Sequence, residues 1–229
     1  GLDPKAGGFD FNLGFLIQKE YDPSVFFLPI DFIYLVLLGI IIGIFAELYS
    51  RYVLLMQNLG KKWYKNKFVL KMSICGFILG SIYSFLPSTF HNLDELQKII
   101  AEQNTSIGIA LLAVLVLFIT TGLAASSGAP GGLFYPMLTL GGAIGLIMGS
   151  WVELVTGHAP STYIFAGMGA FVAGCSRTPI TAMFLAFALT KNLLIMKPVL
   201  ISCIASFLIA RAFNEESIYE RQIQIELDE

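Results

Sequence analysis

Long apolar runs separated by short polar or glycine-rich breaks form the pattern of this chain. Five runs approach or exceed the length of about 20 residues that crosses a bilayer. They cover residues 29–56, 68–86, 107–125, 137–155 and 193–213. Two further runs, 163–175 and 179–190, are too short to cross. Short or glycine- and proline-interrupted segments are typical of binding sites built from broken helices. The pattern therefore predicts an all-α, polytopic membrane protein with broken, re-entrant helices.

The polar segments suggest the organisation and orientation of the chain. Residues 1–28 are interpreted as a loop that leads into a transmembrane domain over residues 29–229, so the chain is expected to be a fragment or one half of something larger. A basic cluster surrounds the first long linker: Arg51, Lys61, Lys62, Lys65, Lys67 and Lys71. The positive-inside tendency places this linker in the cytoplasm, and a solvated loop that binds anionic headgroups would have the same orientation. Residues 88–106 predict a short interfacial helix on the opposite side, and residues 218–227 a final amphipathic helix.

Glycines at four-residue spacing predict where helices approach one another closely, because small residues on one face allow backbones to come together. Three such sets occur in the apolar runs: Gly39 with Gly43, Gly76 with Gly80, and Gly141 with Gly145 and Gly149.

Composition supports a multi-pass protein of the cell membrane. Hydrophobic residues make up 56% of the chain and charged residues 13%, whereas soluble domains carry about 25% charged residues. A net charge of −2 gives no electrostatic reason to expect a nucleic acid partner. The three cysteines, Cys75, Cys175 and Cys203, stand singly in apolar surroundings, so we interpret them as buried thiols. No metal site or cofactor is expected.

The stretch 126–136 interrupts two strongly apolar runs with glycines and prolines. Such a break cannot face lipid, because its backbone groups would lack hydrogen-bond partners there. Pro130 is well placed to begin a helix, which would leave the first-turn amides unpaired at the positive end of the helix dipole. Those amides belong to Gly131, Gly132, Leu133 and Phe134. They predict an anion site without formal charge; the alternative from spacing alone is a tight bend between helices.

Several polar side chains lie within or beside the apolar runs. Hydroxyl groups near the end of the 107–125 run are expected to bond freed backbone groups; they belong to Thr120, Thr121, Ser126 and Ser127. Glu47 is expected to pair with Arg51, four residues later; a functional role for an acid inside the membrane is the alternative. Arg177 borders the second polar break and is expected to cap nearby carbonyls rather than touch an ion.

Residues 127–136 resemble a known family signature. The sequence from Ser127 and Gly128 through Pro130 to Pro136 is similar to the Gly-x-Phe-x-Pro motif of CLC chloride channels and proton-coupled anion transporters, including its Ser-Gly-Ala-Pro-Gly lead-in. The similarity continues in family order through residues 167–170, 177–179 and 217–219.

The resemblance implies the second half of the inverted-repeat CLC fold, and a homodimer with a separate anion path in each subunit. Carried over by position, the amides of Leu133 and Phe134 and the hydroxyl of Tyr219 would hold the central anion. Segments 179–190 and 193–213 would form part of the dimer interface. The expected function is transport of a halide, chloride or fluoride, by a channel or by anion/proton antiport, and not enzyme catalysis.

The chain also departs from the family pattern. It has no Gly-Ser-Gly-Ile-Pro or Gly-Lys/Arg-Glu-Gly-Pro motif; in the family these supply a serine ligand and a gating glutamate from the first half. The N-terminal half of the transporter is therefore an expected partner. Tyr135, Ala188 and Glu47 also differ from the residues that the family usually carries at these positions. These differences favour a compact bacterial member of the family. The fluoride-exporting branch is one candidate.

Two other functions are considered. Residues 125–128 approach the Gly-x-Ser-Gly pattern of rhomboid intramembrane proteases, with Ser127 as nucleophile, but that chemistry needs a nearby histidine base. His91 and His158 both fall in linkers expected on the other side of the membrane. The second alternative is a structural subunit that keeps the fold without conducting ions.

Overall fold

The computed structural model describes residues 29–63, 68–102, 105–128, 132–157, 161–190 and 193–227, and the predicted leading loop 1–28 lies outside them. The described residues form helices and no strand, which confirms the all-α prediction. The helices are α1 (Pro29–Trp63), α2 (Phe68–Ser84), η2 (Ser88–Phe90), α3 (Leu93–Ala101), α4 (Ile107–Ser127), α5 (Phe134–Thr156), α6 (Thr162–Ser176), α7 (Pro179–Thr190), η3 (Leu193–Ile195), α8 (Met196–Phe213) and α9 (Ile218–Leu227).

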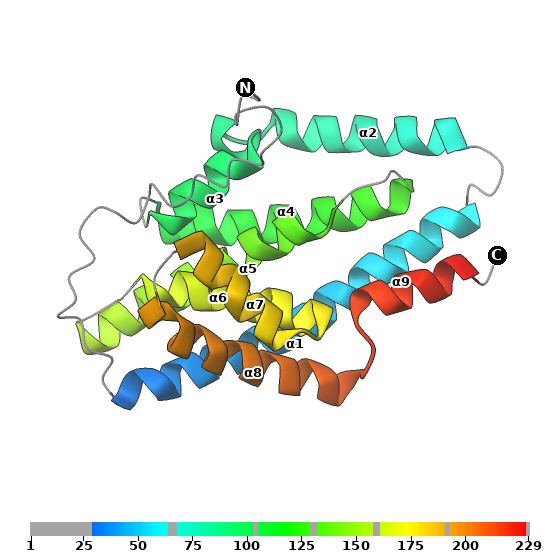
Figure 1. The fold of residues 1–229 in the computed structure, drawn as a ribbon. Helices are drawn as coiled ribbons and strands as arrows, with labels where there is room; N and C mark the ends of the chain where they lie inside the picture. The colour runs from blue at the N-terminus through cyan, green and yellow to red at the C-terminus, as the bar shows by residue number, and fades with distance from the viewer. Residues whose placement is uncertain are drawn as a thin grey trace, which may run out of the picture.

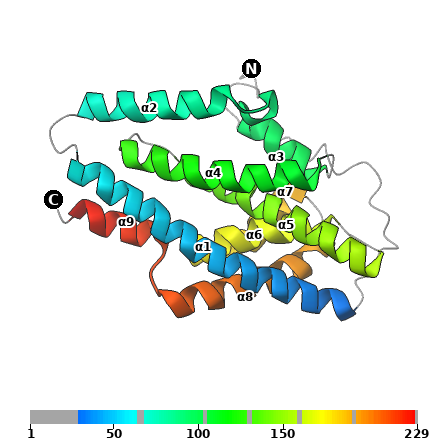
Figure 2. The ribbon, with the colours of Figure 1, turned by 180° about the vertical axis from the view of Figure 1, so that it is seen from behind.

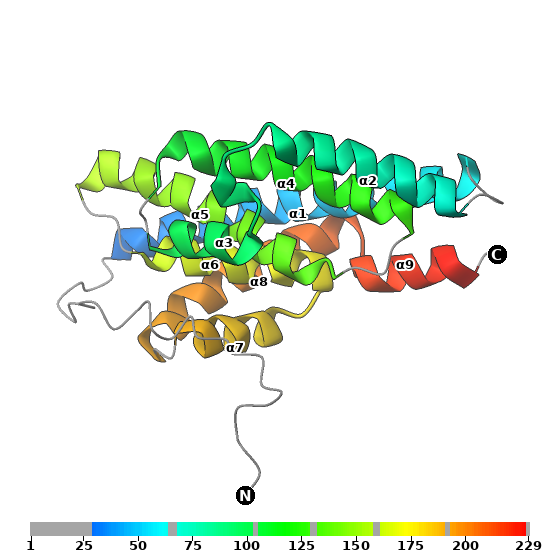
Figure 3. The same ribbon diagram turned by 90° about the horizontal axis from the view of Figure 1, so that it is seen from above.

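Helices α5 and α6 lie at the centre of the molecule. Helices α1 and α8 pack along one side of them, and α9 lies beside the end of α1 (Figures 1 and 2). Helix α2 packs on α4 at one edge, whereas α7 lies at the other (Figure 3). Among the described residues, four helical segments are long and apolar enough to cross a membrane: 30–62, 107–127, 134–156 and 196–225. The protein is therefore a multi-pass membrane protein, with α2, α6 and α7 as shorter apolar helices between its long ones.

Small residues explain the close packing at the centre, as their spacing predicted. A methyl group added to Gly141 or Gly145 of α5 would collide with the backbone of α6 at Gly167 or Tyr163. Gly39 and Gly43 in α1 lie against α8 in the same way. Neither contact leaves room for a side chain, so the glycines set the distance between these helices.

The close helix contact predicted at Gly76 and Gly80 is not found among the described residues. A methyl group added to Gly76 or Gly80 of α2 would meet no described atom within 4 Å. The neighbouring Phe77 is 78% exposed, so this face of α2 points away from the rest of the described chain. Among the described residues the pair forms no helix contact, because the opposite face of α2 is the one that packs on α4.

The two predicted breaks are present. Helix α4 ends at Gly128, which adopts the left-handed conformation (φ 74°) that glycine accepts without strain. Helix α6 ends at Arg177, a non-glycine residue with a positive φ of 62°, and α7 begins at Pro179. Such a conformation in a non-glycine residue persists only where neighbouring contacts hold it.

Candidate anion-binding site

The start of α5 has backbone N–H groups that find no acceptor among the described residues. Leu133 precedes the helix, and its carbonyl accepts the first helical hydrogen bond from the Met137 N–H at 3.1 Å. Among the described residues, no hydrogen bond is made by the N–H groups of Leu133 and Phe134. These groups lie at the positive end of a helix 23 residues long, which is the setting in which helix starts bind anions.

The predicted helix start at Pro130 is wrong, because α5 begins at Phe134. Pro136 gives the physical reason. A helix from Pro130 would place Pro136 in its interior, where the ring clashes with the preceding turn and the missing N–H leaves a carbonyl unpaired. A start at Phe134 instead places Pro136 in the first turn, where no N–H is needed. Pro130 and Gly131 lie outside the described residues, and Gly132 precedes the helix.

A cavity of about 1050 Å³ opens beside this helix start. Its walls come from α1, α2, α3, α4, α9, the first turn of α5 and the segment before it. Five of the residues predicted for the anion site and its family motif line it: Gly128, Gly132, Leu133, Pro136 and Tyr219. The structure therefore brings the central stretch and Tyr219 to one space. The described lining includes Lys61 and Lys71 and no acidic residue, so the cavity favours a negatively charged occupant.

Three of the predicted residues lie outside this cavity wall. Phe134 is half-buried and contributes its backbone beside Leu133. Ser127 is buried, and its hydroxyl donates to the carbonyl of Ala124 at 2.7 Å. Arg177 lies at the far end of α6. Ser127 is thus a helix-end residue rather than a residue that faces the cavity.

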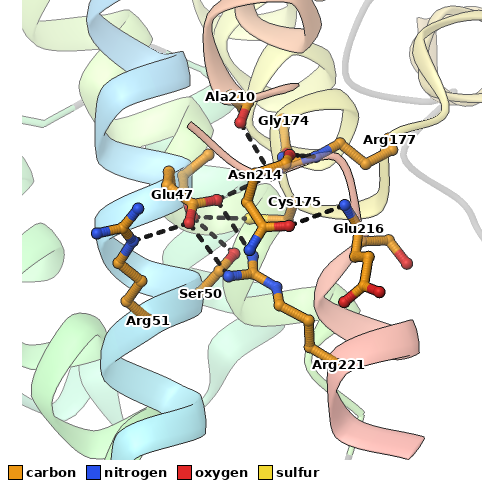
Figure 4. A network of polar contacts seen from close by, with 12 residues as sticks. Glu47, Ser50, Arg51, Gly174, Cys175, Arg177, Ala210, Asn214, Glu216 and Arg221 are labelled. Atoms are coloured by element: carbon orange, nitrogen blue, oxygen red, sulfur yellow. Dashed lines mark hydrogen bonds and ion pairs between the residues drawn. The ribbon is translucent and has the colours of Figure 1, made fainter. Parts of the chain in front are cut away.

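Glu47 is the centre of a buried ion cluster that holds α9 in place. Its carboxylate accepts from Arg51 at 2.9 Å, as predicted, but also from Arg177 at 2.8 Å and from both terminal nitrogens of Arg221 at 3.1 Å (Figure 4). The Glu47 side chain is only 4% exposed. Arg221 follows Tyr219 by two residues, so this cluster fixes the helix that carries Tyr219 to α1 and α6.

Arg177 caps carbonyls, as its place at a break predicted. Its guanidinium donates to the Gly174 carbonyl at the end of α6, to the Ala210 carbonyl at 3.1 Å and to the Asn214 carbonyl at 3.0 Å (Figure 4). The Arg177 side chain thus donates hydrogen bonds to carbonyl groups at the ends of α6 and α8. These contacts hold the Arg177 backbone at its positive φ.

The other hydroxyl and thiol predictions are largely confirmed. Hydroxyl groups near the end of α4 donate to carbonyls of their own helix, Thr120 to Val116 and Ser126 to Leu123. Cys175 and Cys203 are buried free thiols, whereas Cys75 is half-buried beside Ser126, so the expectation of burial is wrong for Cys75.

The protease alternative finds no support in the described geometry. The hydroxyl of Ser127 is bonded to the carbonyl of Ala124. Both ring nitrogens of His91 lie against carbonyl oxygens, those of Ser88 and Tyr83. His158 lies outside the described residues.

The fold defines a class, that of all-helical membrane proteins in which several long apolar helices alternate with shorter, interrupted ones. Residues 10–211 match the family model described as "Voltage gated chloride channel". The chain belongs to this CLC family, which confirms the resemblance of residues 127–136.

Sequence relatives agree with this assignment. The chain is 32% identical over 203 residues to the H(+)/Cl(-) exchange transporter ClcA of Klebsiella pneumoniae, covering 86% of this chain and 43% of the relative. The corresponding protein of Vibrio parahaemolyticus is 29% identical over 191 residues, 81% of this chain and 41% of the relative. The chain therefore spans less than half the length of these relatives, whose names describe transporters rather than enzymes.

Solved structures show the same fold. The structure of a slow cyanobacterial Cl-/H+ antiporter matches with a TM-score of 0.78 and 25% identity, over 90% of this chain and 49% of that one. A eukaryotic CLC transporter matches with a TM-score of 0.72 and 21% identity, over 88% of this chain and 36% of that one.

Proposed function

We propose that this chain forms the second half of a chloride transporter that exchanges chloride for protons. The observation that carries the proposal is the helix start at Leu133 and Phe134, whose N–H groups lack acceptors in the described chain beside a cavity that Tyr219 also lines. The similar proteins are named as H(+)/Cl(-) exchangers and as a Cl-/H+ antiporter, which supports chloride rather than fluoride as the anion and antiport rather than a channel.

Each part of the site has a role in this proposal. The amides of Leu133 and Phe134 bind the ion, and the absence of a side chain at Gly132 lets the ion approach the backbone. Tyr219 contributes a hydroxyl donor from the cytoplasmic side. Amide dipoles hold a halide without a fixed counter-charge, so the ion is bound firmly enough to enter and weakly enough to leave.

The proposal also needs partners. The N-terminal half of the transporter would supply the remaining ligands and the gating glutamate. Two copies would associate through α7 and α8, whose outer faces expose apolar residues such as Ile180, Phe184 and Leu208. Lipid would cover the remaining apolar surface.

Ion flux from liposomes tests the function directly. Vesicles that contain this chain together with its N-terminal half are loaded with chloride, and chloride release and proton uptake are followed together. Chloride release with coupled proton uptake supports the proposal. Chloride release without proton uptake indicates a channel, and the absence of any flux indicates a structural subunit. In parallel vesicles loaded with fluoride, release of fluoride in preference to chloride indicates the fluoride branch.

Tyr219→Phe tests the hydroxyl ligand. A hydrogen bond to a charged group contributes about 1.5–3 kcal/mol, and Tyr219 is 40% exposed, so water competes for this one. We therefore expect chloride affinity, measured by calorimetry, to fall about tenfold, towards the low end of that range. Tyr52→Phe is the matched control, because the Tyr52 hydroxyl donates to the Ile119 carbonyl at 3.3 Å and does not line the cavity. Unchanged affinity in Tyr219→Phe would remove Tyr219 from the ligand set.

A further inference from the structure

A groove of about 440 Å³ lies along the basic end of α1, where α9 packs beside it (Figure 2). Three basic residues line the groove together with three leucines: Arg51, Lys62, Arg221, Leu54, Leu55 and Leu59. The groove shares no described lining residue with the anion cavity. Because its described lining contains no acidic residue, the groove favours a ligand that is negatively charged and partly apolar.

The groove follows one face of α1. Arg51, Leu55, Leu59 and Lys62 succeed one another at intervals of three or four residues, which places them on the same face of the helix. At 1.5 Å per residue, this face extends about 16 Å from Arg51 to Lys62. Leu55 and Leu59 are 54% and 41% exposed, and Leu48, towards the middle of α1, continues the face with 54% exposure. An exposed apolar face that ends in cations matches a lipid acyl chain that ends in a charged headgroup.

Donors for a phosphate group are available in the groove. Arg51 donates to Glu47 through its Nε, whereas its two terminal nitrogens bond no described residue, and its side chain is 59% exposed. These nitrogens form a planar fork that binds phosphate through two parallel hydrogen bonds. Arg221 gives both terminal nitrogens to Glu47, and its buried Nε has no hydrogen-bond partner among the described residues. Lys62 is exposed and adds a third positive charge.

The charge of the adjoining ion cluster also favours an anionic ligand. Arg51, Arg177 and Arg221 share the single carboxylate of Glu47. The cluster therefore carries an excess of two positive charges. The basic linker that follows α1 is expected on the cytoplasmic side, and the cytoplasmic leaflet is the one that contains anionic lipids.

We propose that this groove binds an anionic phospholipid of the cytoplasmic leaflet. The lipid phosphate accepts hydrogen bonds from the Arg51 guanidinium, and Lys62 adds positive charge at the cytoplasmic end of the groove. An acyl chain lies along the exposed leucines of α1. A zwitterionic lipid fits less well, because its own cationic group meets the basic residues of the lining. Since Arg51 and Arg221 also bind Glu47, the bound lipid reinforces the junction of α1 with α9.

Lipid titration of the transporter, with both halves present, tests this site. The protein in neutral detergent is titrated with phosphatidylglycerol or with phosphatidylethanolamine of the same acyl chains, and bound lipid is counted by native mass spectrometry. We expect phosphatidylglycerol to bind more tightly and to raise the thermal midpoint more. Arg51→Met and Lys62→Gln should each weaken phosphatidylglycerol binding about fivefold and leave phosphatidylethanolamine binding unchanged.

Lys98→Gln is the matched control for Lys62→Gln. Lys98 is an exposed lysine of α3 and does not line the groove, so its replacement should leave phosphatidylglycerol affinity unchanged. In lipid-free detergent all three variants should unfold close to the wild-type temperature, because the replaced side chains are exposed. If Arg51→Met fails to fold, the comparison of Lys62→Gln with Lys98→Gln still decides the result.

Leu55→Gln separates a lipid from free phosphate. It should weaken phosphatidylglycerol binding, because it removes part of the apolar face, and inorganic phosphate should neither displace the lipid nor raise the thermal midpoint. Stabilisation by inorganic phosphate that Leu55→Gln leaves unchanged would identify a phosphate site and overturn the lipid site.

Three other results would also overturn the inference. One is equal affinity for the two lipids, and another is an equal loss of phosphatidylglycerol binding in Lys62→Gln and Lys98→Gln, which indicates diffuse attraction to surface charge. The third is a structure of the transporter in lipid nanodiscs in which a segment of the N-terminal half fills the groove. Headgroup density beside Arg51 in that structure would support the site. None of these results changes the proposed chloride site, because the groove and the cavity have separate linings.

Discussion

Replacing Glu47 by glutamine is expected to lower the thermal midpoint of the detergent-solubilised protein by about 10 °C. The amide is nearly the same size as the carboxylate, so packing is kept while the charge is lost. Arg177 and Arg221 would then remain in the interior without their counter-charge, at side-chain exposures of only 7% and 10%. Removing one partner from a buried ion pair costs about 3–5 kcal/mol, because the remaining charge stays desolvated. A thermal melt followed by intrinsic fluorescence measures the shift.

Arg51→Met is the matched control for this prediction. Arg51 binds the same carboxylate at 2.9 Å, but its side chain is 59% exposed. An exposed ion pair contributes less than about 1 kcal/mol, so the midpoint should move by no more than about 3 °C. Arg221→Met, in contrast, should resemble Glu47→Gln, because it removes the buried ion pair that joins α9 to α1. Equal midpoints for Glu47→Gln and Arg51→Met would show that the cluster does not stabilise the fold.

The helices could be predicted from sequence because each follows from a local pattern. The apolar runs 107–125 and 179–190 correspond closely to α4 and α7, and Pro179 marks the start of the latter. Glycines at four-residue spacing identified the contacts of α5 with α6 and of α1 with α8. The same spacing failed in α2, because a glycine pattern shows that a close contact is possible and not that another helix is present.

The residues that line the cavity could be predicted only where they belong to recognisable sequence motifs. Residues 127–136 and Tyr219 were identified from their order and their family resemblance, and the structure places several of them around one cavity. The start of α5 was misplaced by four residues, although the sequence contained a usable signal. Pro136 cannot stand in the interior of a helix without cost, and that alone favours a start close to it.

Contacts between distant elements could not be predicted. Arg177 and Arg221 lie 130 and 174 residues from Glu47, and no local pattern connects them. Arg51, four residues from Glu47, satisfies the rule for ion pairs within a helix. The sequence therefore gives no indication that Glu47 has further partners. Burial of Lys71 could not be predicted either, because it depends on a contact with Gly60 of α1 that no local pattern shows.

Gly145→Ala is expected to destabilise the protein by about 3 kcal/mol, at the upper end of the range for overpacked cores. The added methyl group would collide with the Tyr163 carbonyl oxygen and lie 2.9 Å from the Ile164 Cα, where no ordinary contact occurs. Backbone atoms cannot move aside by a rotamer change, so α5 and α6 must separate. Because α5 carries the Leu133 and Phe134 amides at its start, chloride affinity should fall together with the thermal midpoint.

Gly80→Ala is the control, because its expected effect on stability has the opposite sign to that of Gly145→Ala. A methyl group at Gly80 meets nothing within 4 Å among the described residues, and alanine favours a helix over glycine by about 0.8–1.0 kcal/mol. Its midpoint should therefore equal or exceed the wild-type value, with chloride affinity unchanged. If Gly145→Ala also unfolds at the wild-type temperature, the α5–α6 contact tolerates a larger separation than the structure shows, and the glycines do not set the position of the helix start. If Gly80→Ala is the destabilised variant, the exposed face of α2 is a packing surface in the assembled protein.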